Sequence, residues 1–150
     1  MEIKEGDLFP TFKLLDQNSN SFDLLEFLGK EQLVIYFYPK NETYGCTKQA
    51  CKFRDEFGAF LNLNCKVIGI SNDSPQSHKS FIENHQLPFT LLSDKDGKIR
   101  KQLKLPSDFL GLVPGRITFV INKKGVIVKI INSGTNMNKH IYDALKALED

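Results

Sequence analysis

The sequence has no tryptophan and few residues of the types that bind metals or form cross-links. Its 150 residues include three cysteines, three histidines and two methionines. The histidines, His78, His85 and His140, lack any compact ligand spacing, so no metal site is expected, and His78 and His85 are expected to be solvated. A chain of this length buries roughly 68–70% of its unfolded surface and needs no disulfide framework to be stable. The cysteines are therefore expected to be reduced at rest and to include a functional pair.

The sequence also lacks a strong excess of charge and a long apolar run. Lysine and arginine total 20 against 18 aspartates and glutamates, a formal net charge of +2, which gives no electrostatic reason to expect binding to nucleic acid or to an anionic membrane. The longest strongly apolar run, Leu33 to Tyr38, is far too short to cross a bilayer. Residues 1–7 are charged and have no apolar core like that of a signal peptide. A soluble cytoplasmic protein is therefore expected.

Two near-continuous apolar runs, 33–38 and 66–71, are typical of strands that are buried on both faces. Further along, the apolar segments 117–121 and 126–130 flank Asn122–Gly125, a pattern that predicts a hairpin. No repeat, low-complexity tract or linker divides the chain, and apolar segments continue almost to the carboxyl end. All 150 residues are therefore expected to form a single domain.

Helical patterns lie between the strands. Apolar side chains recur at helical spacing after Cys46, Ser74-Pro75 is a typical helix start, and Asn138 begins a last helical periodicity. The order of elements is strand, helix, strand, helix, followed by two strands and a helix. That order predicts an α/β protein with a thioredoxin-like fold, in which helices flank a central mixed sheet.

One segment combines several features of a reactive thiol. Cys46 follows an apolar strand that Pro39 ends, at the expected start of a helix, where unpaired backbone amides and the positive end of the helix dipole favour an anion. Gly45 lets the backbone come close without a Cβ. A thiol is only a few per cent ionised at neutral pH, and only the thiolate attacks. Because burial disfavours the thiolate, a nearby cation is also expected.

Arg116 is the expected cation, because it lies immediately before the apolar strand 117–121 and could reach across the end of the sheet to Cys46. Arg54 is a weaker candidate further along the helix, and a surface ion pair is the alternative role for Arg116. Thr43 precedes Cys46 by three residues, and its hydroxyl could hold an incoming peroxide oxygen in line with the sulfur. The Cys46 amide, Thr43 and Arg116 would together stabilise charge on the departing oxygen.

Cys51 is the candidate partner for Cys46. Residues five apart on an ideal α-helix have Cα atoms roughly 8 to 9 Å apart, which is beyond the ~7 Å limit for a disulfide. The start of the helix must therefore unwind before these two cysteines can bond, which predicts a folded and a locally unfolded state. The alternative is that both are buried small apolar residues. Cys65 precedes a core strand without any polar motif, and inert packing is expected for it.

The segment Pro39–Cys46 resembles the P-x-x-x-T-x-x-C signature of the peroxiredoxins, and a second cysteine five residues later resembles their bacterioferritin comigratory protein, or peroxiredoxin Q, subgroup. Tyr44 stands where the family usually has proline, and Asn122 replaces a common aspartate. The resemblance extends over nearly the whole chain, through the further stretches 53–55, 67–71, 91–98 and 115–121.

This resemblance implies a thioredoxin-fold thiol peroxidase that reduces hydrogen peroxide and organic hydroperoxides, without metal, flavin or haem, and that thioredoxin recycles. It assigns the peroxidatic role to Cys46, the resolving role to Cys51, and active-site support to Pro39, Thr43 and Arg116. The subgroup is often monomeric, so a monomer is expected. Two rival hypotheses are a peroxide sensor that passes its oxidation to a partner, and a disulfide exchange protein, whose cysteines are usually separated by only two residues.

Overall fold

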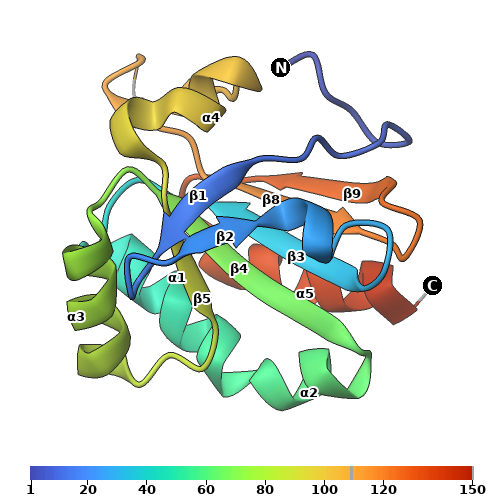
Figure 1. The fold of residues 1–150 in the computed structure, drawn as a ribbon, viewed down its shortest axis with the longest axis horizontal. Coiled ribbons are helices and arrows are strands. Elements are labelled where there is room, and N and C mark those ends of the chain that lie inside the picture. Colours follow the sequence, from blue (N-terminus) through green and yellow to red (C-terminus); the bar gives the residue numbers. More distant parts are fainter. Residues whose placement is uncertain (109, 150) are drawn as a thin grey trace.

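A seven-stranded mixed sheet forms the centre of the structure, a computed structural model that describes residues 1–108 and 110–149 (Figure 1). Strands β3, β4 and β5 are parallel to one another, and the remaining neighbours are antiparallel. In the order in which they lie side by side, the strands are β2 (Ser21–Asp23), β1 (Lys13–Asp16), β5 (Thr90–Ser93), β4 (Cys65–Ser71), β3 (Gln32–Phe37), β8 (Ile117–Ile121) and β9 (Ile127–Asn132).

The central strand β3 explains why the sequence there is a continuous apolar run. Successive side chains of a strand point to opposite faces, and both faces of β3 are covered. One face contributes Val34, Tyr36 and Tyr38 to a first core, and the other contributes Leu33 and Ile35, with their neighbour Phe37, to a second core. All of these side chains are essentially buried. Each contributes about 1.5–3 kcal/mol through burial of apolar surface, so this strand is a main source of stability.

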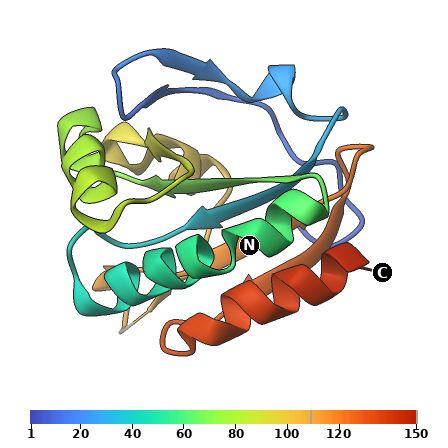
Figure 2. The same ribbon diagram turned by 90° about the horizontal axis from the view of Figure 1, so that it is seen from below.

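Helices complete the layers on both faces. Helices α1 and α5 lie side by side on the face of the first core (Figure 2), while α4 and the amino-terminal segment cover the second. None of the helices in the described residues is long and apolar enough to span a membrane. The helical elements are α1 (Tyr44–Asp55), α2 (Phe57–Asn62), α3 (Pro75–His85), α4 (Lys98–Gln102), α5 (Met137–Glu149) and the 3₁₀ turns η1 (Leu24–Glu26) and η2 (Lys95–Gly97).

The predicted fold class is confirmed. The runs 33–38 and 66–71 form the parallel pair β3 and β4, and the predicted hairpin is the pair β8 and β9. Ser74 caps α3 as expected, because its hydroxyl accepts a hydrogen bond from the amide of Ser77. The sequence prediction missed the hairpin β1–β2, the strand β5 and the short pair β6 (Ser107–Asp108) and β7 (Val113–Pro114).

The register of the sheet brings together two segments that are far apart in the chain. Strands β3 and β8 are antiparallel, and Phe37 at the carboxyl end of β3 pairs with Ile117 at the amino end of β8. The loop that follows β3 and the residue that precedes β8 therefore meet at the same edge of the sheet. That loop leads into α1 and Cys46, and the residue before β8 is Arg116.

Candidate active site

Cys46 and Arg116 are in direct contact inside the protein. Nη1 of Arg116 donates to Sγ of Cys46 at 3.4 Å and to Oε1 of Gln49 at 2.6 Å. The three side chains are buried, with Cys46 only 1% exposed and Arg116 only 5%. At this separation the positive charge of the guanidinium lies directly against the sulfur, in a site with little water to screen it. The expected contact is therefore present, and Arg116 is not in a surface ion pair.

Gln49 is a member of the site that the sequence analysis did not identify. It follows Cys46 by three residues on α1, so the two side chains share a face of that helix. Its carbonyl oxygen fixes the guanidinium, whereas its amide nitrogen is buried without a hydrogen-bond partner among the described residues. The helical spacing from Cys46 was the signal that could have identified it.

Gly45 makes room for the guanidinium. A Cβ atom at this position would lie 3.1 Å from Nη2 of Arg116 and 2.7 Å from Cε of Met137. The methionine end is flexible and can move, but Gln49 holds the guanidinium in place. The expected close approach at Gly45 is therefore between its own backbone and the side chain of Arg116.

Gly45→Ala is expected to slow oxidation of Cys46 by peroxide about tenfold to 100-fold, because a catalytic group displaced by about 1 Å can lose that much rate. Stopped-flow measurement of the reduced protein gives this rate, and the urea midpoint reports the fold. Gly58→Ala in α2 is the matched control, since nothing lies within 4 Å of a Cβ built there. Equal oxidation rates in the two variants would show that the fit around Gly45 has no bearing on the reaction.

Thr43 and Pro39 both lie in the segment that leads from β3 to Cys46. Thr43 is the N-cap residue of α1, but its side chain makes no capping bond and instead donates to the carbonyl of Lys40 at 2.8 Å. The lone pairs of this exposed hydroxyl remain available to accept a hydrogen bond from an incoming O–H group. Pro39 is half-buried and lies just beyond the end of β3, as expected for the residue that ends the strand.

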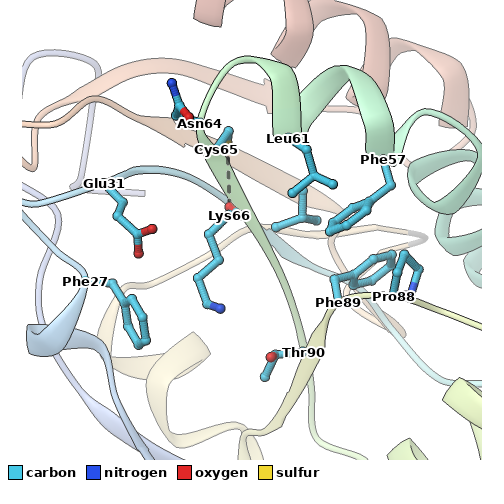
Figure 3. A pocket seen from close by; sticks show the side chains of 11 residues that line it. Phe27, Glu31, Phe57, Leu61, Asn64, Cys65, Lys66, Pro88, Phe89 and Thr90 are labelled. Carbon is cyan, nitrogen blue, oxygen red and sulfur yellow. Dashed lines mark hydrogen bonds between the residues drawn. The ribbon is translucent and has the colours of Figure 1, made fainter.

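The other two cysteines have different surroundings. Cys51 is half-buried in α1, and both Cys46 and Cys51 are free thiols within an intact helix. Cys65 lies at the opposite end of β4, beside a cavity of about 370 Å³ lined by Phe57 and Phe89 among others (Figure 3). Burial raises the pKa of the Cys65 thiol to about 12. Cys65 is therefore a poor nucleophile near neutral pH, in agreement with the expected packing role.

Arg54 does not compete for the role of the cation. Its guanidinium donates to the carbonyl of His85 at 2.7 Å and forms an ion pair with Asp55 at 3.0 Å. Arg116 is therefore the arginine that the fold brings to Cys46.

The expectation that His78 is solvated is wrong. Its side chain is completely buried, as is that of His140. Nδ1 of His140 accepts from the hydroxyl of Thr118 at 2.7 Å, and its Nε2 donates to the carbonyl of Ser133 at 2.7 Å, which ties α5 to β8 behind Arg116. Burial lowers the pKa of His140 to about 4. This histidine is thus neutral and adds no second positive charge to the site.

The arrangement is suited to attack by the buried sulfur on a small electrophile whose leaving group departs as an oxyanion. A guanidinium fixed by Gln49 contacts the sulfur, which lies in the first turn of α1, and the N-cap residue Thr43 carries a hydroxyl with free lone pairs. The described residues contain no group of three or more His, Cys, Asp or Glu side chains that could hold a metal ion.

Comparison with known proteins agrees with this chemistry. Residues 6–130 match the AhpC/TSA family. A chloroplastic peroxiredoxin Q from Populus jackii is 47% identical over 148 residues, which cover 99% of this chain and 69% of the relative. The chain is a peroxiredoxin of the Q subgroup. Membership of this family of peroxidases makes it an oxidoreductase that acts on peroxides.

Solved structures agree with this assignment. The crystal structure of peroxidoxin BcpB from Mycobacterium tuberculosis has a TM-score of 0.89 and 33% identity, over 99% of this peroxiredoxin and 97% of that chain. A bacterioferritin comigratory protein from Xanthomonas campestris, described with its alkyl peroxide reduction activity, has a TM-score of 0.82 and 28% identity over 92% and 90% of the two chains. The resemblance seen in the signature around Cys46 is confirmed.

The expected cytoplasmic location is wrong. The relatives from Populus jackii, Triticum aestivum and Arabidopsis thaliana are all named as chloroplastic proteins, which contradicts that expectation. The expectation rested on the charged residues 1–7. Those residues test only for the apolar core of a secretory signal, which a plastid protein does not require.

Proposed function

We propose that Cys46 is the peroxidatic cysteine of this peroxiredoxin and that Cys51 resolves it, within a single domain that acts as a monomer. The observation that carries the proposal is the 3.4 Å contact between Nη1 of Arg116 and Sγ of Cys46 in a buried site. We propose hydrogen peroxide and alkyl hydroperoxides as substrates, because the Xanthomonas campestris relative is described as reducing alkyl peroxides.

In the first step the Cys46 thiolate attacks the terminal oxygen of the hydroperoxide. An S–O bond forms, the O–O bond breaks, and the departing oxygen takes a proton to leave as water or an alcohol. Arg116 and the amino end of α1 stabilise the charge that develops on that oxygen. Thr43 accepts the hydrogen bond of the substrate O–H group and so aligns the O–O bond with the sulfur. Cys46 becomes a sulfenic acid.

In the second step the thiol of Cys51 gives up its proton and attacks the sulfenic sulfur, an S–S bond forms, the S–O bond breaks, and the hydroxyl takes a proton to leave as water. Because both cysteines belong to α1, its first turns unwind before the bond forms. An external dithiol of the thioredoxin type then reduces the disulfide by two electrons. The location of the plant relatives makes a plastid thioredoxin the proposed reductant.

The test of this function is stopped-flow oxidation of the reduced protein by hydrogen peroxide and by cumene hydroperoxide, followed by turnover coupled to thioredoxin. A peroxidase oxidises rapidly with at least one of the two substrates and then consumes many equivalents while thioredoxin is supplied. A peroxide sensor would oxidise once and stall under the same conditions. A disulfide exchange protein would react slowly with both hydroperoxides.

A further inference from the structure

The loop between β3 and α1 is fastened to a different helix from the one it leads into. Asn41, which is 5% exposed, accepts a hydrogen bond at Oδ1 from the hydroxyl of Tyr38 at 2.6 Å. Its Nδ2 lies 2.9 Å from Nδ1 of His78 and 3.1 Å from the hydroxyl of Ser77, both on α3. Its backbone amide donates to Asp73 at 3.0 Å. Asn41 is therefore held at its backbone and at both polar atoms of its side chain.

His78 has one tautomer that satisfies all of these bonds. Its Nε2 lies 3.0 Å from the carbonyl of Leu92, which is only an acceptor, so Nε2 carries the proton. Nδ1 then accepts from Nδ2 of Asn41. Burial lowers the pKa of His78, which favours this neutral form. The histidine thus connects the loop to β5 through two buried hydrogen bonds.

Glu42 provides a second attachment to α3. Its carboxylate accepts from Nδ2 of Asn84 and from Nε2 of His85, each at 2.7 Å. Its backbone has a φ of +62°, an unfavourable conformation for a residue other than glycine, so these bonds hold a strained turn. Bonding to His85 and Asn84 lowers the pKa of Glu42, which keeps the carboxylate ionised.

The first backbone bond into α1 comes only after these two residues. The carbonyl of Thr43 accepts from the amide of Thr47 at 2.9 Å, whereas the hydrogen bonds of Asn41 and the carboxylate bonds of Glu42 go to Tyr38, Asp73 and α3. Unwinding the start of α1 therefore breaks none of the side-chain bonds that hold Asn41 and Glu42.

We propose that Asn41 is a positioning residue that forms the fixed end of the unwinding segment. The locally unfolded state begins after Glu42, while Asn41 stays fastened to His78 in both redox states. This inference rests on the proposed roles of Cys46 and Cys51. In the folded state the same attachment holds Thr43 and the first turn of α1 against Arg116, which favours oxidation of Cys46. Asn41 acts through these residues and does not touch the peroxide.

Amide hydrogen exchange on the reduced protein and on its Cys46–Cys51 disulfide form tests the position of the hinge. The amide of Asn41 is expected to stay protected in both forms, whereas the amide of Thr47 loses its protection in the disulfide form. Loss of protection at Asn41 on disulfide formation would overturn the proposal. If no such disulfide forms, the proposed resolving role of Cys51 fails instead, so the two failures are distinguishable.

Variants at both ends of the buried bond test the positioning role. Asn41→Ala and His78→Leu are each expected to slow oxidation of Cys46 about tenfold, as loss of one buried hydrogen bond allows, without slowing disulfide formation from the sulfenic acid. The double variant is expected to be no slower than the slower single variant, because the two residues share one interaction. Stopped-flow mixing with peroxide separates the two steps.

Asp23→Ala is the matched control for a general loss of stability, since its carboxylate accepts from the amide of Leu25 and pairs with Lys13 at 4.0 Å, and both partners are far along the chain from the loop. It is expected to leave both rates unchanged. Multiplying effects in the double variant, or the same loss in Asp23→Ala, would overturn the proposal. An unchanged oxidation rate in Asn41→Ala would do so as well.

Discussion

Replacing Arg116 with methionine is expected to slow oxidation of Cys46 by hydrogen peroxide by about 10²–10³-fold, the usual cost of removing a donor that stabilises a developing oxyanion. Methionine keeps much of the apolar volume of the side chain but has no charge and no N–H group. The variant loses both the hydrogen bond to the sulfur and the positive charge beside it. Stopped-flow kinetics at saturating and limiting peroxide give the rate of this step.

Arg54→Met is the matched control, because Arg54 lies on the same helix as Cys46 but bonds to His85 and Asp55. It is expected to oxidise at the unmodified rate. Urea unfolding of both variants separates a local effect from a loss of fold. Equal rates in Arg116→Met and Arg54→Met would mean that the buried guanidinium does not take part in the reaction.

Replacing Cys51 with serine is expected to abolish turnover with thioredoxin while leaving the first oxidation of Cys46 nearly unchanged. Without the resolving thiol the sulfenic acid has no partner within α1, so it accumulates and excess peroxide oxidises it further to the irreversible sulfinic form. A trapping reagent specific for sulfenic acids, followed by mass spectrometry, detects the intermediate. The coupled assay detects the loss of turnover.

Cys65→Ser is the control for this prediction, since Cys65 is buried at the other end of β4 and burial raises the pKa of its thiol to about 12. Turnover is expected to be retained. Normal cycling of Cys51→Ser would remove Cys51 as the obligatory resolver and would require another thiol or a direct reductant.

The contact between Arg116 and Cys46 could be predicted because it depends on strand order and register. An arginine directly before a buried strand lies where that strand begins, at one end of the strands of the sheet. The apolar runs 33–38 and 117–121 identify the two strands. Their pairing, with Phe37 opposite Ile117, then brings the two ends together. Gln49 could have been predicted from a different pattern, its helical spacing of three residues from Cys46.

The hydrogen bonds that hold Asn41 could not be predicted, because nothing in the local sequence identifies the residues that bond to it. His78 shares a helical spacing with Phe81, which is buried in the first core, yet the sequence did not indicate burial of the histidine. Its burial depends on Asn41 and Leu92, which pack against it from other elements. Such a network is specified only by the tertiary structure.

Short strands were missed for a related reason. Strand β1 has an alternating pattern of exposed and half-buried residues, and β2 has only three residues. Neither strand has an apolar run comparable to 33–38. They are stabilised by the pairing of β1 with β2 and with β5, and not by the β-propensity of their own residues. The core strands can be predicted from their apolar runs, whereas the short strands β1 and β2 form only because their neighbours pair with them.

The most direct test of the account is to identify the first sulfur that peroxide oxidises. The reduced protein is treated with one equivalent of hydrogen peroxide in the presence of a reagent that traps sulfenic acids, and each cysteine peptide is then analysed by mass spectrometry. We expect the trapped group on Cys46, together with a Cys46–Cys51 disulfide in the untrapped fraction and an unmodified Cys65. A sulfenic acid found first on Cys51 or Cys65 would contradict the account.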